Sequence, residues 1–260
     1  MIPLVLLGAA GRMGRAVARA AAESQGFRLK ARVERAECIP AVAARDPAES
    51  WSDSLESSVA AGDVVVDFSA GPATRAAARV CAAQGAALVS GTTGLDAETE
   101  AEIEAASRRV AVLRAANFSL GVAALRRALD ETLAALPGTW DIEIVERHHR
   151  GKADSPSGTA LVLAGDAAAR RGLKKDALRF GREGRVGPRP ADEIGVHAIR
   201  GGTWVGDHTV LLSGEGEWIE LRHVASDRQA FAYGALAAAR YLVTSSPGLY
   251  TMNDVLNPNR

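Results

Sequence analysis

The sequence has few cysteines and aromatic residues, no net charge and no long apolar run. Two cysteines, Cys38 and Cys81, are too few for a disulfide-rich secreted scaffold. Their spacing is also not that of a metal site. Thirty-one Lys and Arg balance thirty-one Asp and Glu, so a general polyanion binder is not expected. No apolar stretch approaches the length of a membrane span, and no basic region precedes the first apolar residues. We therefore expect a cytoplasmic protein with reduced thiols.

Strands and helices alternate over the first half of the chain. Apolar runs predict strands at 2–7, 29–33, 64–68, 86–90 and 110–114, with helices at 12–23, 74–84 and 97–108. This alternation predicts an α/β domain, a Rossmann-type parallel sheet with helices on its faces.

The pattern changes after Asn117, where a helix at 119–136 is followed by an alternating strand at 140–147. Three further strands are predicted at 194–199, 208–212 and 218–224, separated by hairpin-like turns at 201–202 and 214–216, and a last helix at 231–243. The arginine-rich segment 179–192 is interpreted as a solvated loop. Runs of strands with helices set apart predict a second, α+β domain with a mixed sheet.

A glycine-rich turn joins the first predicted strand to the first helix. Gly8, Gly11 and Gly14 have the spacing G-x-x-G-x-x-G, where dinucleotide sites usually have G-x-G-x-x-G. Glycines let a pyrophosphate approach backbone N–H groups at a helix start. Glu34, twenty positions beyond Gly14, can accept hydrogen bonds from an adenosine ribose, and Arg35 can pair with a 2′-phosphate. We therefore predict NADH or NADPH as the cofactor and expect use of both.

Two further loops follow strands of the same predicted sheet. Gly91 to Gly94 follows the strand at 86–90, and Ala115 to Ser119 follows the strand at 110–114. Such folds bind ligands at the carboxyl ends of parallel strands. We expect both loops to line the nicotinamide side of the cofactor.

The run from Glu146 to Ala160, ERHHRGKADSPSGTA, combines several chemically active side chains. His148, His149 and Lys152 can supply protons and cationic charge. The turn 157–159 places backbone N–H groups and a hydroxyl at a helix start, where an anion is favoured. A small molecule with carboxylates and a centre that needs a proton would fit this site. Asp154 is expected either to anchor Lys152 or to cap a turn.

The remaining histidines of the second half are interpreted as sheet or interface residues: His197, His208 and His223. The tryptophans there are expected to cover a sheet face that pairs with another subunit: Trp140, Trp204 and Trp218. No metal site is predicted, because the adjacent histidines lack a third ligand at suitable spacing.

Together these segments resemble the 4-hydroxy-tetrahydrodipicolinate reductase (dihydrodipicolinate reductase) family over nearly the whole chain. The matching motifs are GAAGRMG at 8–14, GTTG at 91–94, AANFS at 115–119, ERHHRGKADSPSGTA at 146–160, GREG at 181–184, RGGTWVGDHTV at 200–210 and HVASDRQAFAYGA at 223–235. The run at 146–160 is highly specific to that family. Ala116 departs from the family, whose members commonly carry Pro there, so this loop should be less stiff.

The resemblance implies an enzyme that reduces 4-hydroxy-tetrahydrodipicolinate to tetrahydrodipicolinate with NADH or NADPH in lysine and diaminopimelate biosynthesis. It implies a homotetramer formed through the mixed sheets. It also implies a cofactor domain of residues 1–118 plus about 230–260, and a substrate-binding and tetramerisation domain of residues 119–229.

The site residues that the resemblance implies fall into three groups. The cofactor-binding residues are Gly8, Ala9, Ala10, Gly11, Arg12, Met13, Glu34, Arg35, Gly91, Thr92, Thr93, Ala115, Ala116, Asn117 and Phe118. The catalytic residues are His148 and Lys152. The residues that hold the substrate carboxylates are His149, Lys152, Ser157, Gly158 and Thr159.

Two other functions stay open at this point. Another NAD(P)-dependent dehydrogenase could share the first domain, although the histidine, lysine and PSGT run disfavours it. A non-catalytic NAD(P)-sensing module would need no proton donors, and the sequence has no helix-turn-helix or concentrated basic face. The residues do not decide whether water is lost on the enzyme, or which of His148 and Lys152 delivers the proton.

Overall fold

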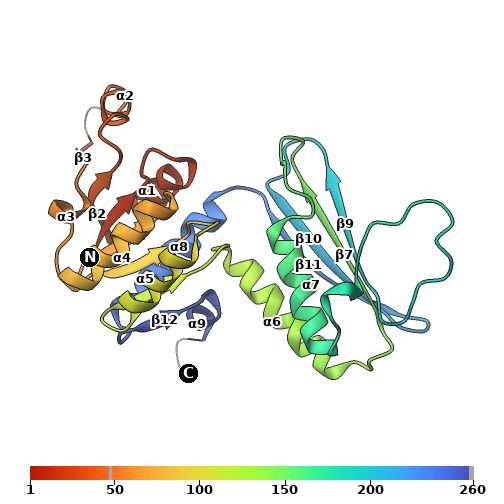
Figure 1. Ribbon diagram of the computed structural model, residues 1–260. Coiled ribbons are helices and arrows are strands. Elements are labelled where there is room, and N and C mark those ends of the chain that lie inside the picture. The colour runs from red at the N-terminus through yellow and green to blue at the C-terminus, as the bar shows by residue number, and fades with distance from the viewer. Residues whose placement is uncertain (47–48, 258–260) are drawn as a thin grey trace. The chain divides into compact units, whose positions relative to one another are not determined.

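The computed structural model describes residues 1–46 and 49–257, and the chain forms two compact units (Figure 1). The first unit combines Met1–Leu120 with Arg228–Arg260, and the second is Gly121–Asp227. The C-terminal segment therefore returns to the first unit. The last three residues of the predicted segment 230–260 lie outside the described residues.

The first unit is built on a parallel sheet whose described strands have the order β12-β6-β5-β4-β1-β2-β3. The chain moves outward from β1 to one edge and then from β4 to the other, which creates the switch point where such sheets bind ligands. The elements are β1 (Ile2–Leu7), α1 (Arg12–Glu23), β2 (Phe27–Val33), α2 (Ile39–Ala43), β3 (Trp51–Ser52), α3 (Leu55–Ser58), β4 (Val64–Asp67), α4 (Gly71–Gln84), β5 (Ala87–Ser90), α5 (Ala97–Ser107), β6 (Ala111–Arg114), α8 (Gln229–Val243), β12 (Gly248–Tyr250) and α9 (Met252–Leu256).

Helices cover both faces of this sheet (Figure 1). On one face, α4 and α5 pack on a core that includes Val65, Leu88 and Ile103. On the other face, α8 contacts β4, β5 and β6 and packs beside α1. Burial on both faces explains why β4 is an uninterrupted apolar run ending in Asp67 and not an alternating strand. The predicted Rossmann-type fold of this unit is confirmed.

The second unit contains a mixed sheet with the order β11-β10-β7-β9-β8. Its elements are α6 (Leu120–Ala135), which begins at the unit boundary, β7 (Asp141–His148), α7 (Gly158–Arg171), a 3-10 turn (Lys175–Ala177), β8 (Leu178–Phe180), β9 (Ile194–Arg200), β10 (Gly206–Ser213) and β11 (Trp218–Ala225). The predicted hairpin at 201–202 is wrong, because β9 is parallel to β7 while β10 pairs with the opposite edge of β7. The turn at 214–216 does connect two paired antiparallel strands, β10 and β11.

The two faces of the mixed sheet differ in character. On one face, α6 and α7 form a core with Ile142, Ile144 and Val210. Residues alternate along β7, so Asp141, Glu143 and the other odd-numbered residues point to the opposite face. The alternating strand predicted at 140–147 is confirmed, and one of its faces is covered.

The arginine-rich segment 179–192 is largely an exposed loop, as predicted, but it has specific contacts. It begins inside an edge strand, β8, and two of its arginines pair with Glu143 on β7. Arg182 Nη2 and Arg189 Nε lie 2.6 Å and 3.0 Å from Glu143 Oε1, and His197 Nε2 lies 2.7 Å from Oε2. Burial raises the pKa of Glu143, but hydrogen bonds from Arg182, His197 and Arg189 together lower it to about 2. The arginines are therefore drawn to a carboxylate that the sequence pattern alone does not connect to them.

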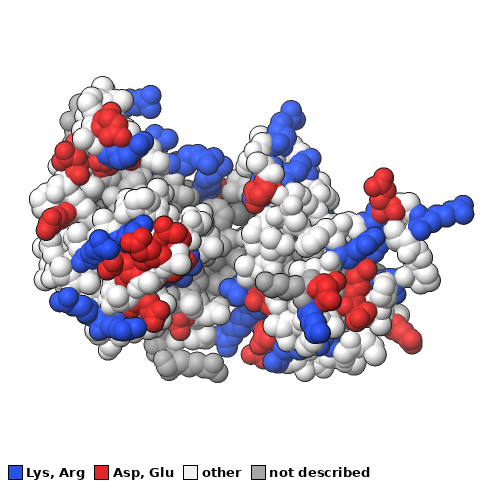
Figure 2. Space-filling model, viewed as in Figure 1, with Lys and Arg blue, Asp and Glu red and all other residues white. Residues whose placement is uncertain are grey.

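Two surface properties bear on partners. Over the described residues of the face in Figure 2, Lys and Arg are interspersed with Asp and Glu and form no extended basic area. Among residues 1–46 and 49–257, no helix combines the length and apolar character needed to cross a membrane.

Candidate active site

The glycine-rich turn after β1 requires glycine at two positions. Gly8 has φ +74°, and a Cβ there would lie 2.7 Å from the carbonyl oxygen of Phe68. A Cβ at Gly14 would lie 2.4 Å from the carbonyl oxygen of Gly8, so Gly14 lets α1 pack directly on the turn. Gly11 stands in the N-cap position of α1. The unusual glycine spacing thus forms the close approach of turn and helix that a pyrophosphate site needs.

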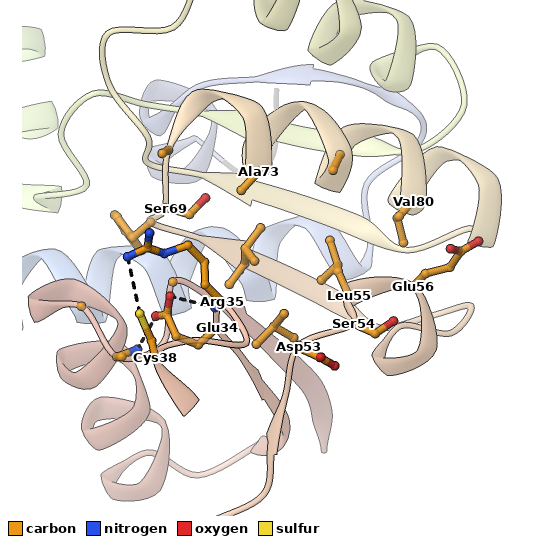
Figure 3. A pocket seen from close by; sticks show the side chains of 18 residues that line it. Glu34, Arg35, Cys38, Asp53, Ser54, Leu55, Glu56, Ser69, Ala73 and Val80 are labelled. Atoms are coloured by element: carbon orange, nitrogen blue, oxygen red, sulfur yellow. Dashed lines mark hydrogen bonds between the residues drawn. The ribbon is translucent and has the colours of Figure 1, made fainter. Parts of the chain in front are cut away.

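A cavity of about 850 Å³ opens at this turn, at the switch point of the sheet (Figure 3). Of the predicted cofactor residues, Gly8, Ala10, Gly11, Glu34 and Arg35 line the cavity. Ala9 is buried, and in the described part of the chain Ala9, Arg12 and Met13 are not lining residues. Other lining residues were not predicted from the sequence: Cys38, Asp53, Ser54, Leu55, Phe68 and Ser69. Leu55 belongs to the short helix α3, and Asp53 and Ser54 lie in the turn before it, a stretch too short for a periodic pattern to be visible.

Glu34 and Arg35 lie together at the cavity, as the spacing predicts (Figure 3). Glu34 Oε2 accepts a 3.1 Å hydrogen bond from the backbone N–H of Ala10, so this carboxylate also holds the glycine-rich turn. Arg35 is mostly exposed, and its guanidinium lies 3.1 Å from Glu37 Oε1 and 3.4 Å from Cys38 Sγ. A 2′-phosphate would therefore compete with Glu37 for Arg35.

The loops 91–94 and 115–119 meet at the ring of Phe68. A Cβ at Gly91 would lie 2.1 Å from Phe68 Cε1, so this position has room only for glycine. Phe118 packs edge-on against Phe68 with ring centroids 5.4 Å apart. Thr93 and Ala116 are exposed, while Thr92 is buried and donates from Oγ1 to Asp67 at 3.0 Å. The structure thus brings the two predicted walls together through Phe68, and it adds Asp67, which the sequence analysis did not single out.

In the second unit, His148 at the end of β7 is held by a buried carboxylate. His148 Nδ1 lies 2.5 Å from Oε2 of Glu146, which has no exposed surface. Strand alternation places both side chains on the same sheet face as Ile144. Because a carboxylate only accepts, Nδ1 carries the hydrogen and Nε2 is left to take or give a proton.

Arg200 on β9 compensates the charge of Glu146. Its Nη1 and Nη2 each lie 2.7 Å from one carboxylate oxygen, and Glu146 Oε1 also accepts the backbone N–H of Ser157 at 2.9 Å. Burial raises the pKa of Glu146, while hydrogen bonds from Arg200, His148 and Ser157 outweigh it and lower that pKa. Arg200 Nη2 also donates to the carbonyl oxygen of Asp154 at 2.7 Å. Glu146 and Arg200 therefore hold the far end of the segment 146–157 in place, through the N–H of Ser157 and the carbonyl oxygen of Asp154.

His208 on β10 joins the same network. Its Nε2 lies 3.2 Å from Ser157 Oγ, and its ring packs edge-on against His148 with centroids 5.2 Å apart. Burial, and then the neighbouring His148, lower the pKa of His208 to about 4, so it is neutral at pH 7. Ser157 Oγ also accepts the N–H of Ala160 at 3.2 Å as the cap of α7. The Ser157 hydroxyl is thus occupied inside the protein, and the neighbouring Gly158 is exposed.

Lys152 is anchored by Asp154, the first of the two roles expected for that carboxylate. Lys152 Nζ lies 2.8 Å and 2.9 Å from the two Asp154 oxygens, and this contact lowers the pKa of Asp154. The backbone N–H of His149 donates to the carbonyl oxygen of Trp204 at 2.8 Å, so the connection between β9 and β10 holds this segment. An incoming carboxylate would exchange with, or share, the ammonium that Asp154 holds.

The described residues contain no group of three or more His, Cys, Asp or Glu side chains placed to hold a metal ion. Both cysteines, Cys38 and Cys81, are free thiols.

Family comparisons match both units. The family model described as dihydrodipicolinate reductase, N-terminus, matches residues 2–118, and the model described as dihydrodipicolinate reductase, C-terminus, matches residues 121–256. A 4-hydroxy-tetrahydrodipicolinate reductase from Thermomicrobium roseum is 46% identical over 258 residues, covering 98% of this chain and 100% of the relative. The corresponding protein from Anaeromyxobacter sp. (strain Fw109-5) is 42% identical over 266 residues, covering 98% of each chain.

Solved structures show the same fold. The dipicolinate-bound dihydrodipicolinate reductase from Paenisporosarcina sp. TG-14 has a TM-score of 0.78 at 23% identity and covers 96% of this chain and 97% of its own. A myo-inositol 2-dehydrogenase from Lactobacillus plantarum has a TM-score of 0.56 at 11% identity, covering 99% and 94%. The two family models and the close relatives lead to one conclusion: the chain belongs to the dihydrodipicolinate reductase family.

Proposed function

We infer that this protein reduces 4-hydroxy-tetrahydrodipicolinate to tetrahydrodipicolinate with NADH or NADPH, a step of lysine and diaminopimelate biosynthesis. The observation that carries this inference is the segment 146–160, which combines a carboxylate-held histidine, a lysine and a helix start. Family membership supports the same reaction. Neither alternative function, another dehydrogenase or a sensing module, explains this segment.

The first unit suits a dinucleotide. The glycine turn would receive the pyrophosphate, Glu34 the adenosine ribose and Arg35 a 2′-phosphate. The loops 91–94 and 115–118 would line the nicotinamide side. The bound cofactor supplies the hydride, and the protein supplies its orientation. We propose that both cofactors are used, because Glu34 favours NADH and Arg35 favours NADPH.

The segment 146–160 suits a small dicarboxylate. Lys152, His149 and the backbone N–H groups of Gly158 and Thr159 would hold the two carboxylates at the start of α7. The dipicolinate bound to the Paenisporosarcina enzyme is a molecule of this charge class. Once hydride reaches the ring carbon that loses water, a proton must come from the protein, and Lys152 and His148 are its proposed donors.

We also propose a cytoplasmic homotetramer formed through the mixed sheets. The sheet face opposite α6 and α7 exposes three large apolar side chains, Ile199 at 40%, Trp218 at 69% and Val224 at 55%. Apolar surface of this kind suits contact with another subunit. The free thiols agree with a reducing compartment.

A coupled assay tests the reaction. Pyruvate, aspartate semialdehyde and the preceding synthase generate the substrate fresh, and the absorbance of reduced nicotinamide is followed with NADH and with NADPH. We expect oxidation of both cofactors that depends on the synthase. A folded protein that binds NADPH but oxidises neither cofactor would contradict the proposed reaction and favour the alternatives.

A further inference from the structure

Asp67 is a buried carboxylate beside the proposed cofactor site. It is the last residue of β4, the strand next to β1 at the switch point of the parallel sheet, and it has no exposed surface. The following residues, Phe68 and Ser69, line the cavity of the first unit.

Five hydrogen bonds from four segments reach this one carboxylate. Oδ1 accepts from the backbone N–H and the hydroxyl of Ser69, at 3.0 Å and 2.5 Å. Oδ2 accepts from Oγ1 of Thr74 at 2.6 Å, Oγ of Ser90 at 3.1 Å and Oγ1 of Thr92 at 3.0 Å. Asp67 therefore ties the cavity wall at Ser69 to the start of α4, the end of β5 and the loop 91–94.

No cation compensates Asp67 among residues 1–46 and 49–257, since every partner is a neutral hydroxyl or N–H group. The start of α4, from which Thr74 donates, adds only the partial charge of a helix end. Asp63 at the other end of β4 is different, because its carboxylate is 2.5 Å from Lys30 Nζ. A buried charge without a counter-ion is costly, and it acts strongly on nearby charge because little water screens it.

We propose that Asp67 is a positioning residue that sets the nicotinamide wall through Thr92 and Ser69, and that its uncompensated charge favours the oxidised cofactor. This proposal rests on the proposed function, which places the nicotinamide at the loop 91–94. Loss of hydride leaves a positive charge on a nicotinamide ring. A fixed negative charge behind that loop stabilises the positive ring more than the neutral one, and so assists hydride donation.

Binding of NAD⁺ and NADH to the whole protein, measured by calorimetry, separates this proposal from a structural role. Asp67→Asn keeps the shape and removes the charge. We expect it to weaken NAD⁺ binding more than NADH binding, by roughly tenfold for two unit charges that interact through an effective dielectric of about 20. Asp63→Asn, at the other end of β4, is the matched control and should leave the ratio of the two affinities unchanged.

A second variant keeps the carboxylate in case Asp67→Asn does not fold. Ser69→Ala with Thr92→Val removes two of the side chains that donate to Asp67, so both nucleotides should bind more weakly while the ratio of the NAD⁺ and NADH affinities stays that of the unaltered protein. Equal weakening of NAD⁺ and NADH binding in folded Asp67→Asn, or a changed affinity ratio in the double variant, would overturn the proposal alone. Failure of the unaltered protein to bind any of NAD⁺, NADH and NADPH would overturn the proposed function with it.

Discussion

Replacing Glu146 by Gln should disable His148 while leaving the shape of the site nearly unchanged. Each oxygen of Glu146 accepts two donors, one from Arg200 and one from either His148 or Ser157. In Glu146→Gln an amide NH₂ group replaces one of these two oxygens, and this group cannot accept hydrogen bonds from the two donors that it faces. If it faces Nδ1 of His148, the imidazole must change tautomer and Nε2 loses its free lone pair.

The size of the effect follows from burial. Removing one partner of a buried ion pair costs about 3–5 kcal/mol. We expect a loss near the lower end, about 3 kcal/mol, because Arg200 keeps its bond to the carbonyl of Asp154. For a chain of this length that lowers the Tm by about 6–12 °C. Loss of one positioned acid–base group lowers kcat by about 10²- to 10⁴-fold.

Glu143→Gln is the matched control, since Glu143 lies on the same strand but on the opposite sheet face, paired with Arg182, Arg189 and His197. It should lower the Tm and leave kcat and its pH profile close to those of the unaltered protein. The assay is the synthase-coupled reaction over a range of pH, with thermal unfolding measured in parallel. A folded Glu146→Gln protein with an unchanged kcat would refute the role of the His148–Glu146 pair.

Three further substitutions test other parts of the site. Lys152→Ala should reduce kcat by about 10²-fold or more while NADPH affinity, measured by calorimetry, is kept; a normal kcat would remove Lys152 from the mechanism. Gly91→Ala places a Cβ 2.1 Å from Phe68 Cε1, so it should cost about 1–3 kcal/mol of stability in chemical unfolding and weaken NADH binding, and unchanged values would contradict this close packing. His208 has its pKa lowered from 6.5 to about 4 by burial and His148, so as the pH falls the unfolded chain takes up the proton first and stability is lost between those values. His208→Gln should flatten that part of the pH dependence of the unfolding free energy; an unaltered slope would show that His208 is not its source.

Much of the fold could be predicted because it depends on local periodicity. The strand at 2–7 and the helix at 12–23 have the predicted bounds, and most other long elements differ by a few residues at their ends. Short elements such as β3, α3 and β12 have too few residues for a period to be visible. The hairpin predicted at 201–202 failed because strand pairing is a long-range property: β7, fifty residues earlier, lies between β9 and β10.

The contacts of the candidate site likewise fall into two groups, those within one segment of the chain and those between distant segments. Interactions within one segment, such as that between Lys152 and Asp154, could be expected from spacing. Arg200 could not, because it reaches Glu146 only through the pairing of β7 with β9. Asp67 ends β4, which was predicted one residue longer at 64–68, but its importance comes from donors on four separate segments, which no single motif contains.

The most direct test of hydride transfer by this protein follows a label from cofactor to product. NADH that carries deuterium at both C4 positions is supplied with substrate made fresh by the synthase, and the tetrahydrodipicolinate is examined by mass spectrometry. We predict one deuterium in the product with the unaltered protein, and almost none over the same time with Lys152→Ala. Folded protein that binds the labelled cofactor but yields unlabelled product, or none, would contradict the assignment as a reductase.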